Sequence, residues 1–180
     1  MSEGPERDHA LHLYDDDTTL ATTVATFLAP GFARDDAIVS IGTRAHVAAI
    51  EQRLRSEGVR VDDAVLSGRY VSMDAERVIA RLLRNGLPTR ETFADVVGHR
   101  IEQLASRHGS VRAFGEIVSL LWRDGKQTAA LRLEDLWNEA LGYQPLSLVC
   151  GYATRTVGTE AAPAVQRIAK AHTRIIRPDA

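Results

Sequence analysis

The chain has 180 residues, of which 44% are hydrophobic and 26% are charged, and its formal net charge at pH 7 is -2. This length and composition predict one soluble globular domain with a full core, and the small charge gives no electrostatic reason to expect nucleic acid or an anionic membrane as a partner. The single cysteine excludes an internal disulfide and a zinc site built from cysteines.

The start of the chain predicts a polar lead, a strand and a helix. Residues 1–8 are polar and acidic, and we expect them to be disordered and to carry no signal region. The apolar run 10–14 predicts the first strand. A helix follows over 19–28, capped by Thr18 and ended by Pro30. Because no apolar run is long enough to span a bilayer, we expect a cytoplasmic location.

Strands and helices continue to alternate along the rest of the chain. Residues 37–41 are a continuous apolar run typical of a central parallel strand, and Thr43 is placed to cap a helix that ends at Glu57. A third strand is predicted around 70–72. The remaining predicted elements are helices over 75–84, 90–107, 127–141 and 163–171, and strands that begin at 111 and cover 146–152 and 175–176. This alternation predicts an α/β fold, a three-layer α/β/α sandwich around a mostly parallel sheet.

The segment 111–122 is the most informative for function. It predicts an apolar strand that ends at Glu116 and continues directly into a helix. In open α/β folds, ligands bind at that end of the strands. Glu116 could accept hydrogen bonds from a ligand hydroxyl or amine, or it could form a structural ion pair with Arg112 or His9.

The turn after the first predicted strand has no phosphate-binding sequence. Residues 14–19 read YDDDTT, without glycine or lysine, whereas a RecA-type ATPase cradles phosphates there with a glycine-rich loop. Three carboxylates repel a triphosphate, so we expect no ATP hydrolysis. The turn could hold a divalent cation, but a solvated turn that caps the next helix is favoured.

Aromatic and charged residues near the strand ends complete the predicted site. If the first and fifth strands lie near the sheet centre, Tyr14, Glu116 and Tyr152 meet at one edge. Trp122 is a candidate pocket wall, although core packing is the commoner use of tryptophan. The candidate ligand-binding residues are Tyr14, Asp15, Arg112, Glu116, Trp122, Tyr152 and His9.

We predict no cofactor, metal site or catalytic nucleophile. His9, His12 and His172 match no known metal-ligand spacing, and Cys150 is expected to be a small buried hydrophobe. His172 is expected to bond to the last carbonyls of the helix before it. Ser119 lacks the flanking glycines that a nucleophile elbow requires.

Several segments of the chain together carry a family resemblance. They are residues 9–16, 27–32, 111–116, 133–138 and 146–152, followed by His172 and 175–176. In order and spacing they resemble the MEDS family, the sensory domain of methanogen and methylotroph regulators. The resemblance implies one sensory domain over 9–177 with a tail at 178–180, a degenerate RecA/KaiC-like fold without a P-loop, and small-molecule ligands such as hydrocarbon derivatives.

The function expected from these patterns is that of a stand-alone, non-catalytic sensory domain. It would bind a small, partly apolar ligand or a regulator protein at the carboxyl edge of the sheet. The chain has no room for a fused output module, so the signal would pass to a separate histidine kinase, anti-sigma factor or STAS-type regulator. Two alternatives stay open, a residual RecA/KaiC-type nucleotide-binding protein and an interaction or oligomerisation module without a ligand. A homodimer could form through an exposed edge strand near Tyr70 or Ile175.

Overall fold

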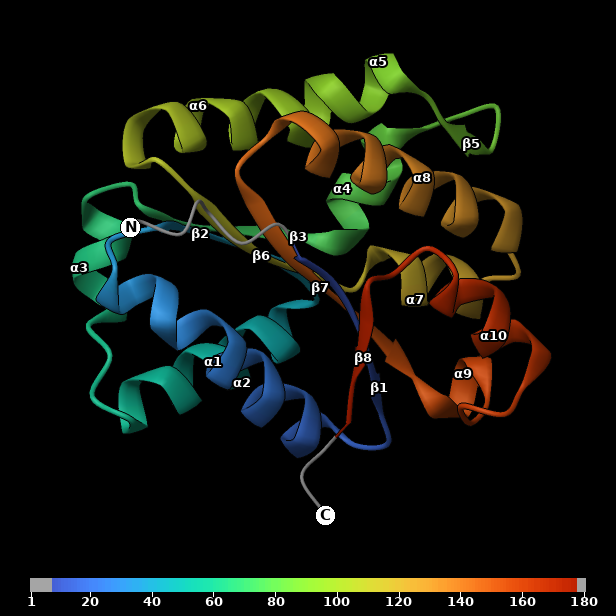
Figure 1. Ribbon diagram of the computed structural model, residues 1–180, viewed down its shortest axis with the longest axis horizontal. Coiled ribbons are helices and arrows are strands. Elements are labelled where there is room, and N and C mark those ends of the chain that lie inside the picture. The colour runs from blue at the N-terminus through green and yellow to red at the C-terminus, as the bar shows by residue number, and fades with distance from the viewer. Residues whose placement is uncertain (1–7, 178–180) are drawn as a thin grey trace.

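A sheet of six parallel strands forms the centre of the computed structural model, which describes residues 8–177 (Figure 1). The strands are β1 (Asp8–Tyr14), β2 (Ala37–Gly42), β3 (Tyr70–Asp74), β6 (Val111–Gly115), β7 (Leu146–Ala153) and β8 (Arg174–Ile176). Their order is β3-β2-β6-β7-β1-β8, and every neighbouring pair is parallel. The expected lead and tail fall on residues 1–7 and 178–180, outside the described residues, whereas Asp8 already belongs to β1.

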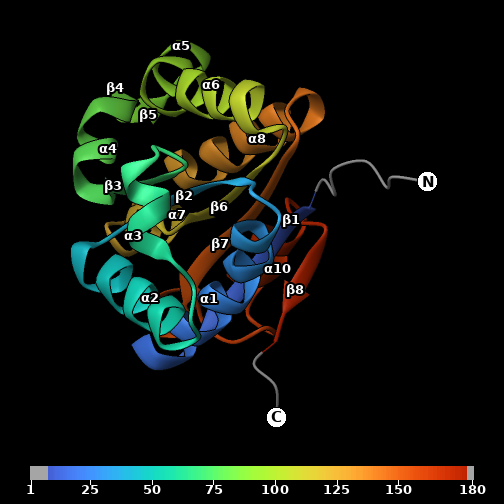
Figure 2. The same cartoon turned by 90° about the vertical axis from the view of Figure 1, so that its left-hand side faces the viewer.

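Helices cover both faces of this sheet, as Figures 1 and 2 show from two directions. One face carries α1 (Asp17–Ala33), α2 (Arg44–Ser56) and α3 (Val61–Leu66). The other carries α4 (Ala75–Leu82), α5 (Arg90–Phe93), the π-helical segment η1 (Ala94–Gly98), α6 (His99–His108), α7 (Ile117–Arg123), α8 (Gln127–Tyr143), α9 (Thr154–Val157) and α10 (Pro163–Ala169). The predicted three-layer sandwich with a parallel central sheet is confirmed.

The central strands are buried on both sides because both helical layers pack against them. All eight residues of β7 are buried, and so are all six of β2. Side chains alternate between the faces of a strand. Accordingly, Cys150 and Tyr152 join the core beneath α8, whereas Val149 and Ala153 join the core beneath α1. This alternation decides which candidate site residues can meet.

Helix α1 is longer than the sequence analysis predicts. The carboxylate of Asp16, not Thr18, caps it by accepting a hydrogen bond from the Thr19 N–H at 2.9 Å. Pro30 lies inside the helix and does not end it. Buried residues on both sides of the proline, Leu28 and Phe32, pack against the sheet. Their burial outweighs the one hydrogen bond that proline cannot donate.

The segment between the second and third strands differs from the prediction. The predicted third strand is confirmed as β3, but residues 61–66 before it form the helix α3. The next helix, α4, ends at Leu82 and not at the predicted residue 84, because Leu83 and Arg84 form the short strand β4. Asn85 and Gly86 therefore do not end the helix but form the two-residue turn of a hairpin between β4 (Leu83–Arg84) and β5 (Leu87–Pro88). Both turn residues have positive φ angles, 51° and 81°, as such tight hairpin turns require.

Smaller differences concern helix ends and regularity. The predicted helix 90–107 is one helical path that contains the π-helical segment η1. Helix α8 continues past Gly142 to Tyr143, and α10 ends at Ala169, before the predicted end at 171. None of the helices in residues 8–177 is long and apolar enough to cross a membrane.

Candidate functional site

Glu116 lies at the carboxyl end of β6 and is 1% exposed. Its carboxylate accepts hydrogen bonds from the backbone N–H of Thr43 and from His46 Nδ1, the latter at 2.6 Å. His46 Nε2 lies 3.1 Å from the Asp17 carboxylate, so one imidazole bridges two carboxylates. We call Asp17, His46 and Glu116 the carboxyl-edge triad. It joins the first turns of α1 and α2 to the end of β6.

The partners that the sequence analysis offered to Glu116 are wrong. The Arg112 guanidinium donates to the Phe27 carbonyl at 3.0 Å and lies 3.6 Å from the Asp36 carboxylate, near the start of β6. His9 lies on the opposite face of the sheet, where its Nε2 is 3.3 Å from Glu134. The actual partner, His46, stands three residues after the helix cap Thr43, in the first turn of α2.

Tyr14 lies beside the carboxyl-edge triad, but Tyr152 does not. The Tyr14 ring meets the His46 ring edge-on, with 6.1 Å between centroids. Burial raises the pKa of Tyr14 to about 12, and the negative charge of Glu116 adds to this effect. Tyr14 pairs in register with Ala153, so Tyr152, one residue earlier, faces the other layer and donates to Glu134 at 2.7 Å. The predicted grouping of Tyr14, Glu116 and Tyr152 is therefore wrong for Tyr152.

Each of the three carboxylates that follow β1 has its own partner. Asp16 caps α1, Asp17 pairs with His46, and Asp15 accepts a hydrogen bond from the Thr154 hydroxyl. Each carboxylate thus has a partner in the place where a phosphate loop would present N–H donors.

Trp122, a predicted pocket wall, occupies a core position. It is 8% exposed and packs edge-on against Tyr152 with 6.5 Å between ring centroids.

A groove of about 590 Å³ runs between α1 and β8. Five threonines from α1 line it: Thr18, Thr19, Thr22, Thr23 and Thr26. The apolar side chains are Phe27, Pro30 and Ile176, and the cations are Arg112, Arg174 and Arg177. Of the predicted ligand-binding residues, only Arg112 lines this groove. The mixture of hydroxyl, apolar and guanidinium groups suits a ligand with an apolar body and acceptor atoms.

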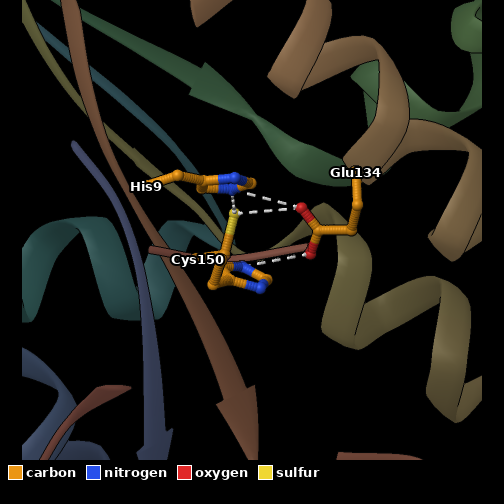
Figure 3. A group of neighbouring side chains, drawn as sticks. His9, Glu134 and Cys150 are labelled. Carbon is orange, nitrogen blue, oxygen red and sulfur yellow. Dashed lines mark hydrogen bonds and ion pairs between the residues drawn. The ribbon is translucent and has the colours of Figure 1, made fainter. Parts of the chain in front are cut away.

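A second polar cluster is buried on the opposite face of the sheet. His9 of β1, Glu134 of α8 and Cys150 of β7 point toward one another in Figure 3. His9 Nε2 lies 3.4 Å from Cys150 Sγ and 3.3 Å from a Glu134 oxygen, and Cys150 Sγ lies 3.7 Å from that carboxylate. His172 joins them, with its Nε2 3.5 Å from the other Glu134 oxygen. We call these four residues the buried quartet.

The outer nitrogens of both histidines are held by fixed acceptors. His9 Nδ1 lies 2.9 Å from the Asn138 side-chain oxygen, and the amide nitrogen of Asn138 donates to the Ala171 carbonyl at 2.9 Å. His172 Nδ1 lies 2.8 Å from the Ile168 carbonyl oxygen, as predicted for a histidine after the last helix. The inner nitrogen of each ring therefore faces the other members of the buried quartet.

Charge in the buried quartet is concentrated on His9 and Glu134. Burial alone would lower the pKa of His9, but the hydrogen bond and charge of Glu134 outweigh it and raise this pKa. Burial alone would raise the pKa of Glu134, but the neighbouring histidines and Tyr152 lower it. Burial lowers the pKa of His172 and raises that of Cys150. These shifts favour the charged forms of His9 and Glu134 and the neutral forms of His172 and Cys150.

The carboxyl-edge triad makes stability depend on pH. The hydrogen bond to Glu116 raises the pKa of His46 above 6.5, so the folded state favours the imidazolium. This stabilisation is complete below pH 6.5 and is lost as the pH rises through the raised pKa. We expect the free energy of unfolding of the native protein to fall over that interval relative to His46→Gln. Denaturant titrations at several pH values measure this difference, and parallel pH profiles would contradict it.

These features define an α/β domain whose first strand–helix turn caps a helix with carboxylates and does not present a phosphate cradle. The chain belongs to the MEDS family, because the family model described as "MEthanogen/methylotroph, DcmR Sensory domain" matches residues 8–173. The resemblance drawn from the sequence is thereby confirmed, and MEDS is a family of sensory domains. No curated protein and no solved structure matches the chain significantly.

Proposed function

We propose that this protein is a cytoplasmic, non-catalytic sensor that binds a small, partly apolar ligand in the groove between α1 and β8. The observation that carries the proposal is the lining of that groove, in which threonines, apolar side chains and guanidinium groups share about 590 Å³. Membership of a sensory family supports the role, and the lining of the groove supports this location. Such a volume matches small-molecule sites in proteins.

The chemistry of the lining narrows the ligand class. Arg174 uses Nε and Nη2 on Asp8, and Arg177 uses the same two nitrogens on Glu160, so each guanidinium keeps further N–H groups for an acceptor. Phe27, Pro30 and Ile176 offer apolar contact area. We therefore propose a short aliphatic molecule that carries an acceptor headgroup, such as a carboxylate or an alcohol.

The signal needs a recipient, and we propose a separate regulator of the histidine kinase, anti-sigma or STAS type. Support for this partner class comes from analogy with sensory domains and not from a particular contact. The residual nucleotide-binding alternative gains no support from the β1–α1 turn, where Asp16 accepts a hydrogen bond from the Thr19 N–H and Asp15 accepts one from the Thr154 hydroxyl. If the groove binds no ligand, the alternative of an interaction module without a ligand is favoured.

Hexanoate and hexanol are suitable probes, because both carry a six-carbon chain and they present the two proposed headgroups, a carboxylate and an alcohol. We expect at least one of them to give saturable chemical-shift changes in α1 and β8. Thr22→Trp, which places an indole in the groove, is expected to weaken that binding at least about tenfold, equivalent to about 1.4 kcal/mol. Ala48→Trp, at an exposed position of α2, serves as the matched control and is expected to bind normally.

Two outcomes would contradict the proposed ligand site. One is the absence of saturable binding by both probes, and the other is binding that Thr22→Trp leaves unchanged. A saturable thermal shift with magnesium and ATP, in place of the aliphatic probes, would favour the nucleotide-binding alternative.

A further inference from the structure

We propose that the buried quartet of His9, Glu134, Cys150 and His172 binds a divalent transition-metal ion of the zinc type. The four side chains offer two imidazole nitrogens, one sulfur and one carboxylate oxygen, and these ligand atoms all lie within 4.8 Å of one another. Zinc in proteins takes these three kinds of ligand, almost always four at a time in structural sites.

The spacing of the ligand atoms fits a tetrahedral ion. Zinc bonds of 2.0–2.3 Å place neighbouring ligand atoms about 3.3–3.8 Å apart at the corners of a tetrahedron. His9 Nε2 lies 3.3 Å from Glu134 Oε2 and 3.4 Å from Cys150 Sγ, and His172 Nε2 lies 3.5 Å from Glu134 Oε1, the other oxygen of that carboxylate. With one ligand atom taken from each residue, the four atoms lie within 4.8 Å of one another. Cys150 Sγ lies 3.7 Å from Glu134.

The buried Nε2 of His172 is the observation that points to a ligand. The side chain of His172 is 0% exposed, and its Nε2 has no hydrogen-bond partner. Because the Ile168 carbonyl only accepts, Nδ1 carries the ring proton and a neutral ring presents its Nε2 lone pair to the quartet. That lone pair faces a carboxylate oxygen, which is also an acceptor. A cation between the two would satisfy both.

His9 is held in the same manner through Asn138. The Asn138 amide nitrogen donates to the Ala171 carbonyl, which directs the amide oxygen toward His9 Nδ1. Nδ1 therefore donates, and Nε2 is turned toward Cys150 and Glu134. Metal-binding histidines commonly have their second nitrogen fixed by such an outer acceptor.

The proposed ion replaces protons that the metal-free quartet holds. Ligation needs the Cys150 thiolate and neutral imidazoles, so binding releases to solvent the thiol proton and any second proton that His9 carries, and the ion takes their place. Four protein ligands leave no open coordination position, so the proposed ion is structural or sensed and does not activate water. The ligands come from β1, α8, β7 and the turn before β8, so the ion would tie the edge strand to the core.

Cobalt(II) provides the decisive test because its spectrum reports both geometry and sulfur ligation. The protein is stripped with EDTA and titrated with Co²⁺, and a parallel sample is refolded from guanidinium with Co²⁺ present so that burial does not block entry. We expect one equivalent to produce intense visible bands of tetrahedral cobalt and a thiolate-to-cobalt charge-transfer band. Cys150 is the only cysteine in the chain, so that band can arise only there.

Variants separate the proposed site from adventitious binding. Cys150→Ser is expected to lose the charge-transfer band, and Asn138→Ala is expected to keep it while weakening Co²⁺ about 10–100-fold. His99→Gln, an exposed histidine with 61% of its side chain accessible, is the control and is expected to bind like the native protein. Melting temperatures with and without Zn²⁺ show in each variant whether a folded protein still gains stability from the ion.

The proposal is overturned if neither the titrated nor the refolded native protein develops the charge-transfer band. It is also overturned if binding survives Cys150→Ser without change or disappears in His99→Gln, because either result would place the ion elsewhere. The proposal is likewise overturned if Zn²⁺ raises the melting temperature of the native protein and of Cys150→Ser by the same amount.

Discussion

Replacing Glu134 with glutamine is expected to lower the free energy of unfolding by about 3 kcal/mol in metal-free protein at pH 7. The carboxylate is 0% exposed, receives a hydrogen bond from Tyr152 at 2.7 Å and lies 3.3 Å from His9 Nε2. Removal of the negative charge takes away the counter-charge that raises the pKa of His9 and favours its buried charged form. His9 can avoid an unpaired buried charge by losing its proton. The expected loss of unfolding free energy is therefore at the lower end of the range for a broken buried ion pair.

Guanidinium titrations in the presence of EDTA measure this effect without interference from bound metal. Glu139→Gln is the matched control, since it makes the same chemical change on the same helix. Its carboxylate is 38% exposed and pairs with Arg90, which is 76% exposed, so the expected cost is below about 1 kcal/mol. Equal losses in the two variants would contradict the interpretation of Glu134 as a buried ionic partner.

Replacing Phe114 with alanine is expected to cost about 3–5 kcal/mol of unfolding free energy. Phe114 is 0% exposed on the central strand β6, and its ring lies between glycines of the two neighbouring strands. A Cβ placed on Gly42 would lie 3.2 Å from one edge of the ring, and a Cβ placed on Gly151 would lie 3.2 Å from the other. The ring thus fills the space that these glycines leave open, and its removal creates a cavity.

A double-mutant cycle checks this explanation more sharply than the single variant. Gly151→Ala in the native protein forces the Phe114 ring to move and is expected to cost about 1–3 kcal/mol. In the Phe114→Ala background the same methyl group enters the vacated space. We therefore expect the double variant to lose less unfolding free energy than the sum of the two single variants, by about 0.5–3 kcal/mol. Additive losses would show that the ring and Gly151 do not share space.

Hydrophobic periodicity was enough to predict the layers and the sheet, but not all helix boundaries. Runs such as those of β2 and β7 are apolar throughout because both helical layers bury them. The end of α1 was misplaced because Pro30 is a strong local signal that tertiary packing of Phe32 overrides. Helix α3 was missed because only Val61 and Ala64 of its residues are buried, which leaves almost no periodic signal.

The candidate sites were only partly predictable, because they join residues far apart in the sequence. Glu116 was found from its place at a strand end, but its partner His46 lies 70 residues earlier. The signal was present, since His46 follows directly after another predicted strand and helix cap. The buried quartet depends on β1 lying next to β7 beneath α8, an order of strands that residue spacing does not encode. Glu134 itself gave no cue, because carboxylates are rarely buried.

The shortness of β8 has a consequence for self-association. β8 pairs with β1 over only three residues, Ala10 to His12, and ends one side of the sheet. Thr173 and Arg174 hold its start by hydrogen bonds and an ion pair to Asp8. A strand this short offers few backbone amide and carbonyl groups for pairing with a strand of another chain. It therefore disfavours edge-to-edge association of copies at this edge of the sheet. The five-residue β3 at the far margin is the longer template for pairwise strand addition.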